Sequence, residues 1–200
     1  MSRTVFSLAA CALLGGLLAQ SWLPLGAGFL GGAILVAAAY RLRAHWQRQP
    51  AAPEMAERSA LLSSGATLVC LGYFAGKLYL IGPDLDLAAR STRAMGSQLW
   101  VLIGASLLAQ WIARAPEAAC DERDADIASR ALRSTAWVLL ALQLVVLMWF
   151  SFVKDGSMAA MSAGMLVHLL IGSWMLAHVF YDLCCMRAYA LTRTFAPGSA

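Results

Sequence analysis

Uncharged apolar stretches divide this chain into membrane-length segments separated by short charged gaps. Five windows contain no Asp, Glu, Lys or Arg, and they cover residues 4–40, 59–76, 94–113, 134–153 and 156–181. A helix of about 20 apolar residues crosses the roughly 30 Å hydrocarbon core of a bilayer. The pattern therefore predicts that every window crosses a membrane as helix.

The first window is too long for one crossing. Its 37 residues would form a single helix of about 55 Å at 1.5 Å per residue. Pro24, Gly26 and Gly28 supply a turn near its middle. We therefore expect an all-α polytopic membrane protein, a single integral membrane domain over 1–200 with six transmembrane helices, at about 4–20, 24–41, 59–82, 95–114, 133–153 and 158–186.

Composition supports this fold class and limits the alternatives. The chain is 60% hydrophobic and 13% charged, with a mean hydropathy of +0.67, which is too apolar for a soluble domain of 200 residues. Charged loops of at most about 20 residues leave no room for a separate soluble catalytic domain.

The segments 102–110 and 170–178 are identical at five of nine positions. Chance similarity among Leu, Ala and Gly explains this match, and an array of three duplicated hairpins is the alternative.

Positive charges predict the orientation, because Lys and Arg favour cytoplasmic loops. With the N-terminus inside, eleven arginines fall on the cytoplasmic side: Arg3, Arg41, Arg43, Arg48, Arg58, Arg114, Arg123, Arg130, Arg133, Arg187 and Arg193. The other side receives only Arg90, Arg93 and Lys154. We expect both termini to be cytoplasmic. The net charge of +4 is then a topology signal, and no nucleic-acid partner is expected because the arginines form no continuous basic face.

The densest charge cluster precedes the fifth predicted span. It contains Asp121, Glu122, Arg123, Asp124, Asp126 and Arg130. Acidic residues at this position suit the start of a long helix, where the helix dipole favours negative charge, and Asp121 is a candidate cap. Asp126 and Arg130 form an i,i+4 pair, while Ile127 and Ala131 share another face that can lie against lipid or protein. The functional alternative is a docking surface for a cytoplasmic partner or for lipid headgroups.

The Asp-Glu-Arg sequence followed by Ile127 and Ala131 and then by a span resembles uncharacterised prokaryotic multi-pass membrane proteins that carry a DERD-type motif ahead of a transmembrane helix. The match covers residues 121–144. The resemblance supports a multi-pass membrane protein and carries no chemistry with it. We expect the protein to lie in the plasma (inner) membrane of a prokaryote. Six spans exceed the number usual in that group.

Polar residues within the spans are the other candidates, because an ionisable group in hydrocarbon is costly and usually faces protein or water. Gln143 and His168 fall near mid-membrane together with Thr67, Cys70 and Ser106, and could form a polar layer in which Gln143 orients His168. A simple interhelical hydrogen bond is the competing interpretation.

Three further residues in the spans could take part in transport. Lys77 lies about one turn from the outer end of the third span, after a Gly72-xxx-Gly76 spacing that permits close helix packing. Its side chain could extend to the headgroups or serve as a counter-ion. His178 and Asp182 form an i,i+4 pair near the inner end of the sixth span, which suits either a proton relay or an interfacial hydrogen bond.

The sequence predicts no metal site and no cofactor. His168 and His178 are ten residues apart on one predicted helix, about 15 Å along its axis, so they cannot share an ion. Phosphate-binding loops, nucleophile elbows and zinc-protease motifs are missing. We therefore expect a non-catalytic membrane component that interacts through its cytoplasmic motif, with a small ion, proton or solute transporter as the alternative. Its partners are the bilayer and a cytoplasmic or membrane protein, and a homo-oligomer is compatible with the pattern.

Overall fold

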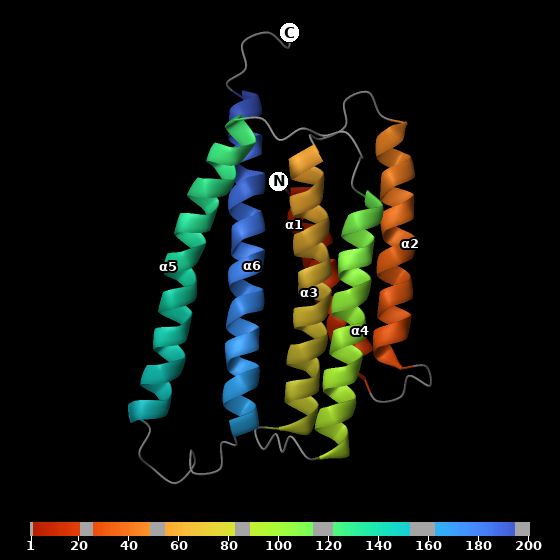
Figure 1. The fold of residues 1–200 in the computed structure, drawn as a ribbon. Helices are drawn as coiled ribbons and strands as arrows, with labels where there is room; N and C mark the ends of the chain where they lie inside the picture. The colour runs from red at the N-terminus through yellow and green to blue at the C-terminus, as the bar shows by residue number, and fades with distance from the viewer. Residues whose placement is uncertain are drawn as a thin grey trace.

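The chain folds into long helices that run roughly side by side in the computed structural model (Figure 1). The structure describes residues 2–20, 26–48, 55–82, 89–113, 122–152 and 163–194, and all regular structure within them is helical. The helices are α1 (Ser2–Leu18), α2 (Ala27–Gln47), α3 (Met55–Ile81), α4 (Arg90–Ala113), α5 (Glu122–Phe152) and α6 (Ala163–Thr194). Each predicted apolar segment therefore forms a helix.

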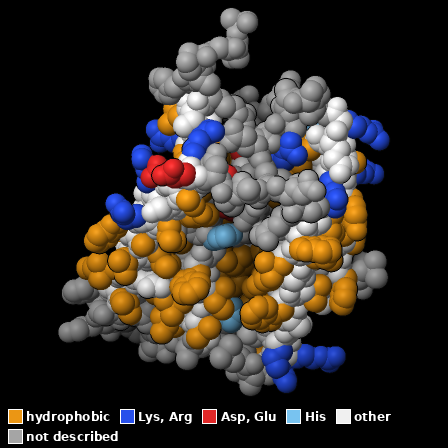
Figure 2. All heavy atoms as spheres, turned by 45° about the horizontal axis from the view of Figure 1, so that its top comes forward, with side chains coloured by type: hydrophobic (Ala, Val, Ile, Leu, Met, Phe, Trp, Pro, Cys, Tyr) orange, Lys and Arg blue, Asp and Glu red, His pale blue; other side chains and the backbone are white. Residues whose placement is uncertain are grey.

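Five helices, α2 to α6, are long and apolar enough to cross a membrane. The remaining helix, α1, has 17 residues and would extend about 25 Å at 1.5 Å per residue. A band of hydrophobic side chains lies between two ends that carry Lys and Arg side chains (Figure 2). These helices are compatible with the expected membrane protein.

Arginines gather at one end of the bundle, which we call the arginine-rich end. There α2 ends, α3 begins, α5 begins and α6 ends (Figure 1). The Arg58 guanidinium lies 5.4 Å from the centre of the Trp46 ring, and Arg43 donates a hydrogen bond of 2.9 Å to the carbonyl oxygen of Ile112. Lys77 and Arg90 lie towards the opposite end. Apart from Arg114, which lies outside the described residues, the arginines that the sequence assigns to one side belong to helix ends at this end of the bundle.

Helix α3 is central, since it packs against α1, α4 and α6, while α2 packs mainly against α4. Glycines permit the closest pairing, between α1 and α3. A Cβ atom at Gly72 would lie 2.1 Å from the carbonyl oxygen of Ala12, and one at Gly76 would lie 2.6 Å from the Cβ of Ala19. The close packing that the Gly-xxx-Gly spacing predicts is confirmed, and its partner is α1. The first two helices therefore pack on later helices more than on each other, unlike a simple series of hairpins.

Helix α5 packs mainly against α6. Ile127 and Ala131 are buried against Ala60, Cys185 and Tyr189 at the arginine-rich end. From there α5 diverges from α6 towards the opposite end (Figure 1). Most of its apolar side chains remain exposed, including Trp137 and Leu144. Such a face suits contact with lipid, because lipid tails are as apolar as these side chains.

Candidate functional site

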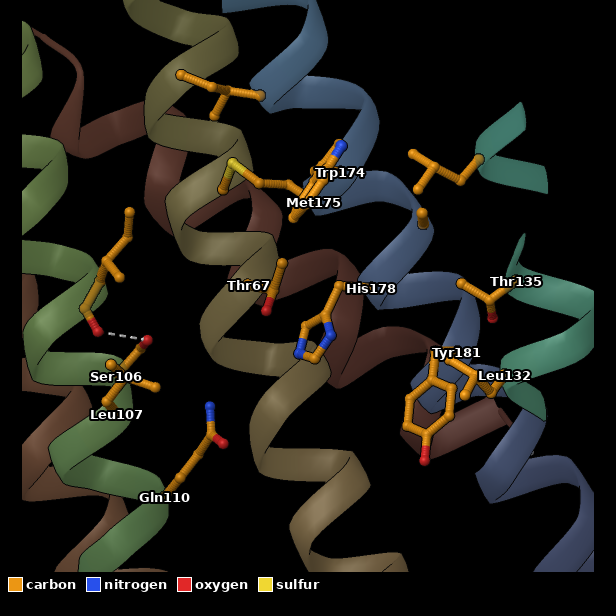
Figure 3. Close-up of a pocket in the computed structure, with 14 residues that line it drawn as sticks. Thr67, Ser106, Leu107, Gln110, Leu132, Thr135, Trp174, Met175, His178 and Tyr181 are labelled. Atoms are coloured by element: carbon orange, nitrogen blue, oxygen red, sulfur yellow. Dashed lines mark hydrogen bonds between the residues drawn. The ribbon is translucent and has the colours of Figure 1, made fainter. Parts of the chain in front are cut away.

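A cleft of about 520 Å³ lies between α4 on one side and α5 on the other, with α3 and α6 between them (Figures 1 and 3). Its apolar part is lined by Ile171, Trp174 and Met175 of α6 together with Leu107 and Leu139. Histidine side chains are visible in a hollow flanked by hydrophobic ones (Figure 2). The cleft is therefore largely apolar, with polar groups at defined places.

Polar side chains from four helices converge at the part of the cleft nearer the arginine-rich end. They are Thr67 of α3, Ser106 and Gln110 of α4, Thr135 of α5, and His178 and Tyr181 of α6 (Figure 3). Ser106 donates a hydrogen bond of 2.8 Å to the carbonyl oxygen of Ile103, while the hydroxyl oxygen of Thr135 is buried without a hydrogen bond among the described residues. The cleft thus combines an apolar body with a polar end, which matches the usual build of a small-molecule site.

His178 connects the cleft to a buried carboxyl group. Its side chain is 52% exposed, and its Nε2 lies 3.8 Å from Oδ2 of Asp182, whose side chain is 5% exposed. Ser63 of α3 and His178 share a hydrogen bond of 2.8 Å between Oγ and Nε2. The same hydroxyl interacts with the Asp182 carboxyl group. Ser63, His178 and Asp182 form what we call the α3–α6 polar cluster.

One oxygen atom of the buried Asp182 carboxyl group lacks a hydrogen-bond partner. This atom, Oδ2, makes no hydrogen bond to any described residue. Among the described residues, only His178 lies within ion-pair distance of the carboxyl group. A buried carboxylate is costly unless its charge is neutralised. A proton can neutralise the charge of Asp182 in two ways: it can bind to the carboxyl group itself, or it can bind to the imidazole of His178 and make that ring a positive partner. The cluster can therefore hold a proton in two positions next to the cleft.

The residues that were expected to form one polar layer with His168 lie in different surroundings. His168 is buried, donates a hydrogen bond of 2.6 Å from Nδ1 to the carbonyl oxygen of Gly164, and stacks on Phe74 with ring centres 5.6 Å apart. Gln143 is half-buried on α5, and no hydrogen bond joins it to His168 among the described residues. Cys70 belongs to the apolar core. Of the expected layer, only Thr67 and Ser106 line the cleft, and they do so with His178.

The charged motif at the start of α5 has two faces. On the inner face, Asp124 accepts a hydrogen bond of 2.8 Å from the Tyr189 hydroxyl. Arg123 lies 5.7 Å above the Tyr189 ring and also donates a hydrogen bond to Thr192. These contacts join the start of α5 to the end of α6.

On the outer face, Arg130 and Asp126 form an ion pair of 2.7 Å between exposed side chains, and Glu122 is exposed beside them. The expected i,i+4 pair and the apolar face of Ile127 and Ala131 are thus confirmed. Asp121, the candidate cap, lies outside the described residues. The contacts on the inner face of the motif join α5 to α6.

Within the described part of the chain, no group of three or more His, Cys, Asp or Glu side chains is placed to hold a metal ion. Ser63 is a member of the candidate site that the sequence analysis did not single out. The signal available for it was a serine pair, Ser63 and Ser64, inside an uncharged span.

Comparison of the chain with protein-family models, with curated proteins and with solved structures finds no significant match. The local resemblance over residues 121–144 thus stays a prediction.

Proposed function

We propose that this protein is a membrane transporter that binds a small amphipathic solute in the cleft and couples its movement to a proton held by His178 and Asp182. The observation that carries the proposal is the buried carboxyl group of Asp182, which lies 3.8 Å from a histidine that lines the cleft. Ionisable residues inside apolar helical bundles are rare, and they commonly belong to ion or proton pathways.

The cleft lining indicates the class of solute. Trp174, Ile171 and Leu107 offer an apolar surface, while Gln110 and His178 offer hydrogen-bonding groups at one end (Figure 3). A solute with an apolar body and a polar head can therefore be held in one orientation. A head group that bonds to His178 competes with Ser63 and Asp182 for the same imidazole. Binding thereby changes where the proton is held, which is the coupling that proton-linked transport requires.

The experiment uses the full chain in proteoliposomes that contain a pH-sensitive dye. A panel of small amphipathic amines and alcohols is added outside, and proton movement into the lumen is followed. We expect at least one compound to drive proton uptake with wild type, and we expect Asp182→Asn and His178→Gln to abolish that uptake. His168→Gln is the matched control, because His168 is buried away from the cleft lining. Equal proton uptake by wild type and Asp182→Asn with every compound would contradict the proposal.

The second candidate function is docking of a cytoplasmic partner on the outer face of the α5 motif. It is favoured by the exposure of Glu122, Asp126 and Arg130 on one side of the helix start. The test replaces Glu122 and Asp126 by Lys and leaves Asp124 unchanged, since Asp124 bonds to Tyr189. Loss of a protein that co-purifies with wild type supports docking. An unchanged set of co-purifying proteins argues against it. The predicted orientation, with the arginine-rich end in the cytoplasm, belongs to this proposal.

A further inference from the structure

A second cavity lies at the end of the bundle opposite to the arginine-rich end. Its volume is about 450 Å³, and residues from α1, α2, α3 and α4 or from their ends line it. Its polar lining residues are Gln20, Tyr73, Lys77, Ser91 and Gln98. It shares no lining residue with the cleft described above. Nothing in the proposed transport mechanism uses this cavity.

The side chain of Gln98 is held in place by the start of α2. Its Oε1 accepts a hydrogen bond of 2.7 Å from the backbone N–H of Gly28. A Cβ atom at Gly26 would lie 2.7 Å from Nε2 of Gln98, so only glycine leaves room for the amide at this distance. With its oxygen already bonded to α2, the Gln98 amide has its N–H groups left to offer to a ligand.

The described lining of the cavity is positively charged. Lys77 is half-buried in its wall, and none of the described lining residues is acidic. Gly26 and Ala27 bring the N-terminal end of α2 to the same cavity, where the helix dipole adds partial positive charge. An ammonium group, amide N–H groups and a serine hydroxyl are the donors that bind phosphate oxygens.

We propose that this cavity binds a phosphate group. Lys77 supplies the charge, and Gln98 and Ser91 supply hydrogen bonds. Apolar side chains of Leu80 and Ile81 also line the cavity, so a phosphate carried on a lipid headgroup is accommodated together with the first carbons of its glycerol. A free phosphate ion uses the same donors, and the experiment separates the two sources.

The test is native mass spectrometry of the full chain, released from detergent after incubation with phosphatidylglycerol or with diacylglycerol, which has the same apolar part but no phosphate. We expect wild type to retain phosphatidylglycerol preferentially. Lys77→Gln should weaken this retention about tenfold or more, because a hydrogen bond to a charged group contributes about 1.5–3 kcal/mol. Lys77→Arg should restore it. Arg93→Gln is the matched control. Arg93 lies on α4 at the same end of the bundle as Lys77, its side chain is exposed, and it does not line the cavity.

Gln98→Glu tests the same site without shortening any side chain. The carboxylate can still accept the bond from Gly28, and it places a negative charge in the cavity that Lys77 lines, so retention of phosphatidylglycerol should be lost. If inorganic phosphate displaces the lipid from wild type, the cavity takes phosphate itself. If it does not, the lipid headgroup is the ligand. Equal retention of the two lipids by wild type, or undiminished retention by both Lys77→Gln and Gln98→Glu, would overturn the proposal.

Discussion

Two adjacent glycines of α1 provide a direct test of the packing at the centre of the bundle. A Cβ atom at Gly15 would lie 2.1 Å from the carbonyl oxygen of Val69 and 2.7 Å from the backbone nitrogen of Tyr73. Both distances are below the 3.4 Å at which ordinary van der Waals contact begins, and the first is short of it by more than 1 Å. Both atoms belong to the α3 backbone, so no side chain can move aside. A Cβ atom at Gly16 meets nothing within 4 Å.

Gly15→Ala must therefore push α1 away from α3, whereas Gly16→Ala leaves the packing unchanged. Overpacking a core costs about 1–3 kcal/mol, and alanine favours a helix over glycine by about 1 kcal/mol. The clash at Gly15 is with backbone atoms, so the upper end of this cost applies, and the helix gain reduces it. We therefore expect Gly15→Ala to lower the free energy of unfolding by about 2 kcal/mol, and Gly16→Ala to leave it equal or raise it by up to about 1 kcal/mol. Unfolding by SDS in mixed micelles, followed by circular dichroism, measures both. Equal unfolding midpoints for the two variants would refute the close approach of α1 and α3.

Further outcomes follow from other contacts and from the arrangement of the arginines. Tyr189→Phe and Asp124→Ala should each destabilise the protein by about 1–2 kcal/mol, with effects that do not add, because each removes the same hydrogen bond. Arg130→Ala at the exposed pair should cost less than about 0.5 kcal/mol in the same unfolding assay. A cysteine placed at Arg93 should react with a membrane-impermeant maleimide on intact cells while one at Arg130 should not, and the reverse labelling would show the opposite orientation. Asp182→Asn should leave stability equal or higher while proton uptake is lost, since it removes a buried charge with little change of shape; a stability loss above about 1 kcal/mol would instead indicate a structural role.

The helices could be predicted because apolar windows of membrane length have one structural solution, in which all backbone groups bond within the segment. The turn expected around Pro24 and Gly26 followed from the length of the window 4–40, which is too long for one crossing. In the structure, α2 begins at Ala27. Pairing could not be predicted in this way. Gly15, Gly72 and Gly76 permit close packing but do not specify a partner, and the choice of α3 by α1 depends on how all the helix surfaces fit together.

The candidate site was predicted in part. The i,i+4 spacing placed His178 and Asp182 on one face of one helix, which the structure shows. The emphasis on His168 came from its depth, and depth does not determine which way a side chain faces. Ten residues at 100° each leave His168 and His178 about 80° apart around the helix, so one is buried beside Phe74 while the other reaches the cleft. Ser63 comes from another helix, and no spacing within one sequence segment could link it to His178.

The charged motif and the cleft are connected through α5. The helix is fastened to α6 by Ile127, Ala131 and the bond from Tyr189 to Asp124. In the next turns Leu132, Thr135 and Leu139 form one wall of the cleft. Because α5 packs mainly against α6 and diverges from it beyond this point, the contacts at its start determine where that wall stands. The motif ahead of the span then has a role in the cleft's geometry whether or not a partner binds to its outer face. The contacts of Arg123 and Asp124 with Tyr189 and Thr192 thus give the charge cluster a structural role, which is to fasten the start of α5 to the end of α6.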